Sequence, residues 1–210
     1  LNTTGDFNTA LGSLTLDANT TGANNTACGE GSLSANTTAS NNTAVGFQAL
    51  EENTTGTENV AVGAIALTAA TTASYNTGIG RYALGNTTTG GSNTGVGHNV
   101  LKENTTGTQN VAVGGSTLDA NTTGGANTAI GENALGANTT ASNNVAVGRV
   151  ALGANSTGTQ NVAVGTNSLD ANTDANNNTG VGYNSLTANT TGTKNTALGS
   201  NTLVANTTAD

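Results

Sequence analysis

The fold is decided by nine residues, Asn42–Leu50, which read NTAVGFQAL. The run Thr43–Val45 has strand-forming residue types and lies between an Asn and a Gly, where chains turn. The pattern returns from Asn59 as NVAVGAIAL and from Asn127 as NTAIGENAL. We therefore expect a repeat protein with one main strand in each repeat.

The period is strict along the whole chain. Twelve blocks of 17 residues run from Asn2 to Ala205 without insertion or deletion, and five further residues begin a thirteenth. We number the positions of each block from one to seventeen and interpret residues 1–210 as a single repeat array. Terminal repeats of a free-standing solenoid depart from consensus. Because the end blocks here are nearly consensus, we expect the chain to be a segment of a longer fibre.

The composition excludes an ordinary globular enzyme. Charged residues make up 8% of the chain and aromatic residues 2%, Pro, Met and Trp are absent, and the net charge is −8. Such bias without a period would indicate disorder, but a strict period indicates a solenoid. The single Cys excludes a disulfide framework within one chain, and no apolar run is long enough to predict a membrane span.

A repeat of this length is too short for a helical hairpin, and its many Gly, Asn and β-branched residues oppose a helix. We predict an all-β fold, a parallel β-solenoid (β-roll) of twelve 17-residue coils. Each coil is expected to hold the N-T-A-V-G strand and two shorter extended pieces, around T-T and around A-L.

Three positions never vary: Asn at position seven, Gly at position eleven and Leu at position fifteen. We expect the Gly to turn the chain at a positive φ, and the Asn to adopt a left-handed turn and hydrogen-bond to its copies in neighbouring coils. The Leu and the aliphatic residue at position ten are predicted to fill the core. The members of these columns that we single out are Asn25, Asn42, Asn59, Asn110, Gly29, Gly46, Gly63, Gly114, Leu33, Leu50, Leu67 and Leu118.

Position nine holds only Ala or Gly. Because side chains alternate along a strand, it faces away from positions eight and ten. A column of such small residues indicates that another surface packs closely against it, and we expect coils of different chains to meet there.

The motif NTAVGxxALxxNTTG, seen at Asn42–Leu50 and Asn127–Leu135, resembles the head repeats of YadA-like trimeric autotransporter adhesins. It is also similar to NTAIG...AL...NTTG repeats of bacterial and phage fibre proteins with a C-terminal intramolecular chaperone domain. The resemblance implies left-handed β-rolls in a homotrimer. It also implies a non-catalytic shaft or head of an extracellular fibre or adhesin, on a cell surface or a phage, with host proteins or glycans as further partners.

We find no catalytic, cofactor-binding or metal-binding residues. His98 occupies a variable position and is expected to be solvated, and Cys28 replaces Val in an aliphatic column and is expected to be buried. The recurring Gly lacks the G-K-[ST] of a phosphate loop, and the negative charge disfavours nucleic acid. Asn-Thr-Thr triplets match the glycosylation sequon, but a repeated Asn ladder explains them without a sugar. Acidic residues at positions sixteen and seventeen of the repeat are expected to form a discontinuous, solvated stripe: Asp17, Glu51, Glu52, Glu103, Asp119 and Asp170.

Ice binding is the alternative function, because positions two and three are Thr in eleven of the twelve blocks each. Adjacent residues on a strand face opposite sides, so these two ranks do not form the paired T-x-T array of a flat ice-binding face. We therefore favour the fibre.

Overall fold

The computed structural model describes residues 2–209, which contain twelve three-residue strands and no helix. The chain divides into two compact units, one up to Thr106 and the other from Gly107. The all-β fold class is confirmed.

Each unit contains six strands, all at positions eight to ten of the repeat. The first unit holds β1 (Thr9–Leu11), β2 (Thr26–Cys28), β3 (Thr43–Val45), β4 (Val60–Val62), β5 (Thr77–Ile79) and β6 (Thr94–Val96). The second holds β7 (Val111–Val113), β8 (Thr128–Ile130), β9 (Val145–Val147), β10 (Val162–Val164), β11 (Thr179–Val181) and β12 (Thr196–Leu198).

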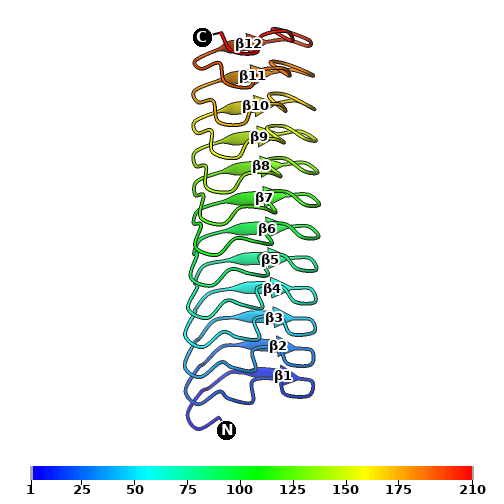
Figure 1. Cartoon of the computed structure of the whole chain (residues 1–210). Helices are drawn as coiled ribbons and strands as arrows, with labels where there is room; N and C mark the ends of the chain where they lie inside the picture. The colour runs from blue at the N-terminus through cyan, green and yellow to red at the C-terminus, as the bar shows by residue number, and fades with distance from the viewer. Residues whose placement is uncertain (1, 210) are drawn as a thin grey trace. The chain divides into compact units, whose positions relative to one another are not determined.

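Within each unit the strands pair in parallel with their sequence neighbours (Figure 1). The pairing keeps the register of the repeat, so that Val45 of β3 lies beside Val62 of β4, seventeen residues later. In the second unit Val147 of β9 pairs in the same way with Val164 of β10. The expected parallel β-solenoid is therefore confirmed, with one repeat making one coil.

The expectation of two further extended pieces in each coil was wrong. Bends follow Asn at position one, and turns run from the Gly at position eleven through the A-L pair. Backbone hydrogen bonds still join these segments from coil to coil. The amide of Thr54 donates to the carbonyl of Thr71 (2.9 Å), and the amide of Leu50 donates to the carbonyl of Ala66 (3.0 Å). Left-handed residues at positions six, thirteen and fifteen interrupt the extended backbone between these bonds.

The turn at position eleven requires glycine. Gly63 has a φ of +133°, and a Cβ added there would lie 2.6 Å from the carbonyl oxygen of Gly80 in the next coil. The Asn at position seven does not adopt a left-handed conformation, contrary to expectation. That conformation belongs instead to the residue before it, such as Glu58 (φ 59°), and to residues of the turn, such as Leu50 (φ 52°).

The core of each coil lies between the strand and the A-L turn. The invariant Leu is fully buried in both units, as at Leu67 and Leu135, and the Ala or Gly at position nine faces it. A Cβ added to Gly78 would lie 3.4 Å from Cδ1 of Leu67. The small column therefore packs against Leu of its own chain, and our inference that another chain meets it was wrong.

Position ten is not part of the core. The prediction that its aliphatic residue fills the core together with the Leu was therefore wrong for this position. The middle residue of each three-residue strand points inward, so both flanking residues point outward. Ala44 is fully buried, for example, whereas its neighbour Val45 is exposed.

Buried Asn side chains bond successive coils to each other, as predicted. At position seven, Nδ2 of Asn42 donates to the carbonyl of Gly56 (2.9 Å), and Oδ1 of Asn42 accepts the amide of Asn59 (2.9 Å). The bonds recur in the second unit, where Nδ2 of Asn110 donates to Gly124 (2.9 Å) and its Oδ1 accepts the amide of Asn127 (3.1 Å). Each amide therefore satisfies backbone groups that the narrow coil buries.

A second Asn ladder, at position one, is interrupted in the first unit. Nδ2 of Asn53 donates to Oδ1 of Asn36 (3.1 Å), but the next two coils carry Ala70 and Thr87 in place of Asn. Among the described residues, Oδ1 of Asn53 and Oγ1 of Thr87 are the buried side-chain atoms left without a hydrogen bond.

We predict that Ala70→Asn stabilises the protein by about 1–3 kcal/mol, because the new amide reaches Oδ1 of Asn53 and its own oxygen accepts from the Thr87 hydroxyl. The midpoint of chemical unfolding measures the gain. Ala66→Asn, also fully buried but outside any ladder, is the matched control and should destabilise. A loss of stability in the Ala70 variant would contradict the ladder.

We also predict opposite effects of glycine at two neighbouring turn positions. Val150 is β-branched yet has a φ of 59°, so Val150→Gly should be more stable than Val150→Ala by about 1 kcal/mol. At Ala154, whose φ is not positive, Ala→Gly should instead cost about 0.5–1 kcal/mol. Equal behaviour at the two sites in thermal unfolding would rule out left-handed strain at Val150.

Candidate interaction surface

The outer face of the sheet is the most regular exposed surface of each unit. It is formed by position eight, which is Thr or Val, and position ten, which is Val, Ile, Leu or Cys. Val45 and Ile79 in the first unit are 37% and 39% exposed, and Val113 and Ile130 in the second are 37% and 41% exposed. We call these two columns the sheet face.

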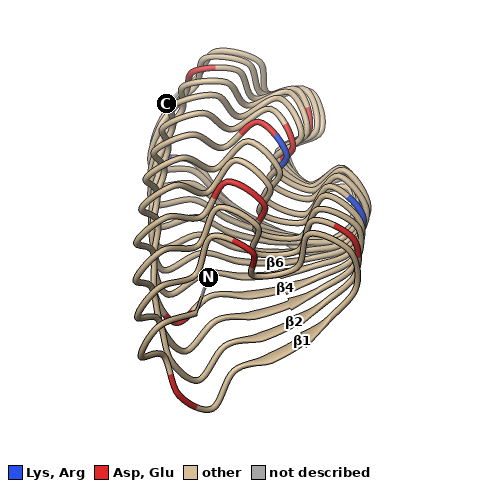
Figure 2. Cartoon of the chain, turned by 90° about the horizontal axis from the view of Figure 1, so that it is seen from below, with Lys and Arg blue, Asp and Glu red and all other residues tan. Residues whose placement is uncertain are grey.

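The sheet face carries no charge. Neither of its columns holds Asp, Glu, Lys, Arg or His in any of the twelve repeats. Figure 2 shows the charged residues of both units on the connecting segments and not on the strands. Aliphatic and Thr side chains in an uncharged array are the surface composition of a protein contact, since no charge would be desolvated there.

Cys28 lies on this face and not in the core, so the expectation of a buried thiol was wrong. It is the last residue of β2, is partly exposed and pairs in register with Val45. Position ten tolerates it because its side chain projects outward.

The two Thr columns of the N-T-T segment behave differently from each other. At position two the hydroxyl donates to the Thr carbonyl of the next coil, as in Thr54 to Thr71 (3.0 Å) and Thr122 to Thr139 (3.0 Å). At position three Thr55 and Thr140 are exposed. One rank is therefore engaged within the coil stack and one faces solvent, as the alternation of side chains predicts.

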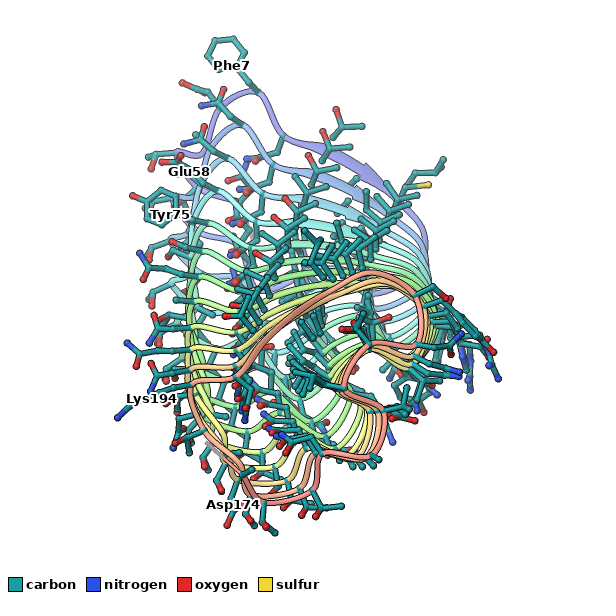
Figure 3. All side chains as sticks on the ribbon, turned by 90° about the horizontal axis from the view of Figure 1, so that it is seen from above. Phe7, Glu58, Tyr75, Asp174 and Lys194 are labelled. Carbon is teal, nitrogen blue, oxygen red and sulfur yellow. The ribbon has the colours of Figure 1, made fainter. Side chains whose placement is uncertain are left out.

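The variable columns project away from the coils. Position six holds Phe7, Glu58 and Tyr75 in the first unit and Lys194 in the second, and Figure 3 shows these side chains pointing outward. Phe7 is 86% and Tyr75 59% exposed. These side chains can change without disturbing the core.

The six acidic residues of the predicted stripe lie on the turns at positions sixteen and seventeen, exposed or partly exposed. Hydrogen bonds from Lys102 and Asn86 lower the pKa of the Glu103 carboxyl, with Oε1 of Glu103 3.0 Å from Nζ of Lys102. In the second unit Asp170 accepts a hydrogen bond from the Thr187 hydroxyl (2.6 Å).

Over residues 2–209, no cluster of His, Cys, Asp and Glu is arranged to hold a metal ion, and no pocket is found. No helix long and apolar enough to span a membrane occurs in the same range. His98 is exposed on a turn, as expected.

The structural columns singled out from the sequence are all found on the inside or at the turn of the coils. The Asn and Leu members are buried and the Gly members have φ between 130° and 137°, at Asn25, Asn42, Asn59, Asn110, Leu33, Leu50, Leu67, Leu118, Gly29, Gly46, Gly63 and Gly114.

Sequence reasoning missed the sheet face. The sequence held only part of the signal, because a middle residue never larger than Ala shows that this side of the strand is closely packed but does not show whether the chain's own turn or another chain packs there. Comparison of the chain with protein-family models, characterised proteins and solved structures gives no match.

Proposed function

We propose that the chain is a non-catalytic shaft or head segment of an extracellular fibre or adhesin, assembled from copies of itself. The observation that carries the proposal is the uncharged sheet face, with an aliphatic residue exposed in six of the twelve coils and a partly exposed position-ten residue in the others. The partner of this face is a second and a third copy of the chain, in the homotrimer that the repeat motif implies.

A copy of the same chain is the partner that fits this face best. The rows of the sheet face repeat at the spacing of adjacent strands, about 4.8 Å. A surface with the same repeat can match every row, whereas an irregular surface matches only a few. Burying this face also moves apolar area from water, at about 25 cal/mol for each Å².

Length, stiffness and a repeated surface are what the fold supplies to such a fibre. The variable columns at positions six and twelve project from turns that the Gly column and the buried Asn and Leu columns hold in place. We assign contacts with a host surface protein or glycan to these columns, which places the protein on a cell surface or a phage particle.

The mass in solution tests the assembly. Light scattering should give three times the chain mass of 20.3 kDa. A mass of one chain at micromolar concentration would overturn the proposal.

Charge placed on the sheet face should dissociate the trimer. We predict that Val62→Lys with Val147→Lys gives monomers that keep the β-sheet signal in circular dichroism, because the ammonium groups cannot be desolvated. The matched control adds the same charge at position three, as Thr55→Lys with Thr140→Lys, and should remain trimeric. Equal dissociation of both pairs would contradict an interface on this face.

The single thiol reports on the same face independently. In the trimer Cys28 should react slowly with a thiol reagent, and in the Val62→Lys, Val147→Lys variant it should react at the rate of a solvated thiol. Rapid reaction in both would place the interface elsewhere.

Ice binding is the outcome that would replace this function. The position-two hydroxyls are bonded within the coil stack, as in Thr54 to Thr71, which leaves one Thr rank on that side. Thermal hysteresis of the purified chain is the measurement, and clear activity would contradict a purely structural role.

A further inference from the structure

Coils five and six of the first unit, residues 70–103, break the rules of the repeat more than their neighbours do. They lack Asn at position one, where Ala70 and Thr87 leave two buried polar atoms unpaired. The same two coils carry every basic residue of that unit, namely Arg81, His98 and Lys102. Functional residues are expected at positions where a sequence departs from the pattern that stabilises the rest of the fold.

Arg81 is held in place but keeps its hydrogen-bonding groups free. Its guanidinium carbon lies over the Tyr82 ring, 4.5 Å from the ring centroid, which is within the range of a cation–π contact. Stacking leaves the N–H groups at the edge of the guanidinium available for an oxyanion. Within residues 2–209 Arg81 forms no ion pair with a carboxylate.

His98 projects from the next coil at the same position of the repeat. The two turns are in register, because the amide of Asn99 donates to the carbonyl of Arg81 (3.1 Å). Both Arg81 and His98 are exposed, and adjacent coils are about 4.8 Å apart. Side chains that start from backbones this far apart can reach one oxyanion between them.

Lys102 is a second cation near the same ring. Its ammonium lies 6.0 Å from the centroid of the Tyr82 ring and 3.0 Å from Oε1 of Glu103. Nδ2 of Asn86 donates to Oε2 of Glu103 (2.7 Å). The Glu103 carboxylate is therefore already paired with Lys102 and Asn86.

We propose that Arg81 and His98 form a binding site for a single oxyanion, a carboxylate, sulfate or phosphate group carried by a small ligand. The surroundings exclude a long polyanion. The turns of the preceding coils carry Glu30, Glu51 and Glu52, which would repel further negative charges. A ligand with one terminal acidic group, such as an acidic sugar, can place that group between Arg81 and His98 without bringing a second negative charge near these carboxylates.

The site is separate from the sheet face, because it lies on the turns at position twelve. Its test therefore does not depend on self-association, and either proposal can fail without the other.

The single histidine provides the measurement. When the protein is labelled with ¹³C-histidine, its NMR spectrum contains one imidazole signal, that of His98, because the chain has a single histidine. The full chain is titrated with acetate, glucuronate and inorganic phosphate, and with glucose as the uncharged control, at constant pH and ionic strength. We expect a saturable shift of the His98 signal with at least one oxyanion and none with glucose.

Arg81→Gln should weaken that binding about tenfold or more, since a charge-assisted contact is lost. Arg149→Gln is the matched control, because Arg149 occupies the same repeat position in the second unit but lies 3.4 Å from Glu132. Tighter binding of glucuronate than of acetate would identify an acidic sugar, and equal binding a bare oxyanion. No saturable shift with any oxyanion, or equal loss in both arginine variants, would overturn the proposal.

Discussion

The structure depends on hydrogen bonding between identical side chains brought together by the repeat. An amide side chain is the group that can both donate to and accept from a neighbouring coil. Asn42 does both, since its Nδ2 bonds Gly56 and its Oδ1 accepts the amide of Asn59. A carboxylate in that column would place like charges one strand spacing apart, and an aliphatic residue would leave buried backbone groups unpaired. The strict 17-residue period follows from this, because one insertion would shift every later residue out of its column.

In this narrow coil the small residue of each strand lies inside and the larger residues of the strand lie outside. Only the middle residue of each strand faces inward, and it must be Ala or Gly because the Leu of the turn folds back against it, as Leu67 does near Gly78. The Leu adopts φ near 50°, a conformation that costs a non-glycine residue about 1–2 kcal/mol. Burial of a Leu side chain contributes roughly 1.5–3 kcal/mol, which offsets that strain. The larger aliphatic residues are left outside, and they create the surface through which we propose that copies assemble.

Surface chemistry is separated from stability in this fold. The buried columns are nearly constant, whereas exposed positions such as Glu58, Tyr75 and Lys194 differ from coil to coil. Coils five and six are the exception, because there Ala70 and Thr87 interrupt a buried ladder in the same coils whose turns carry Arg81 and His98.

The sequence by itself determined the fold class, the length of the coil, the buried Asn and Leu columns and the Gly column of the turn, because a strict period forces identical residues to stack. It also indicated that positions eight and ten share one face of the strand. Only the tertiary structure decided that this face is the outer one. Alternation of side chains relates neighbours to each other but does not say which side the chain closes over. That choice is made by the left-handed residues of the turn, such as Leu50 and Val150, whose φ values the sequence pattern did not reveal.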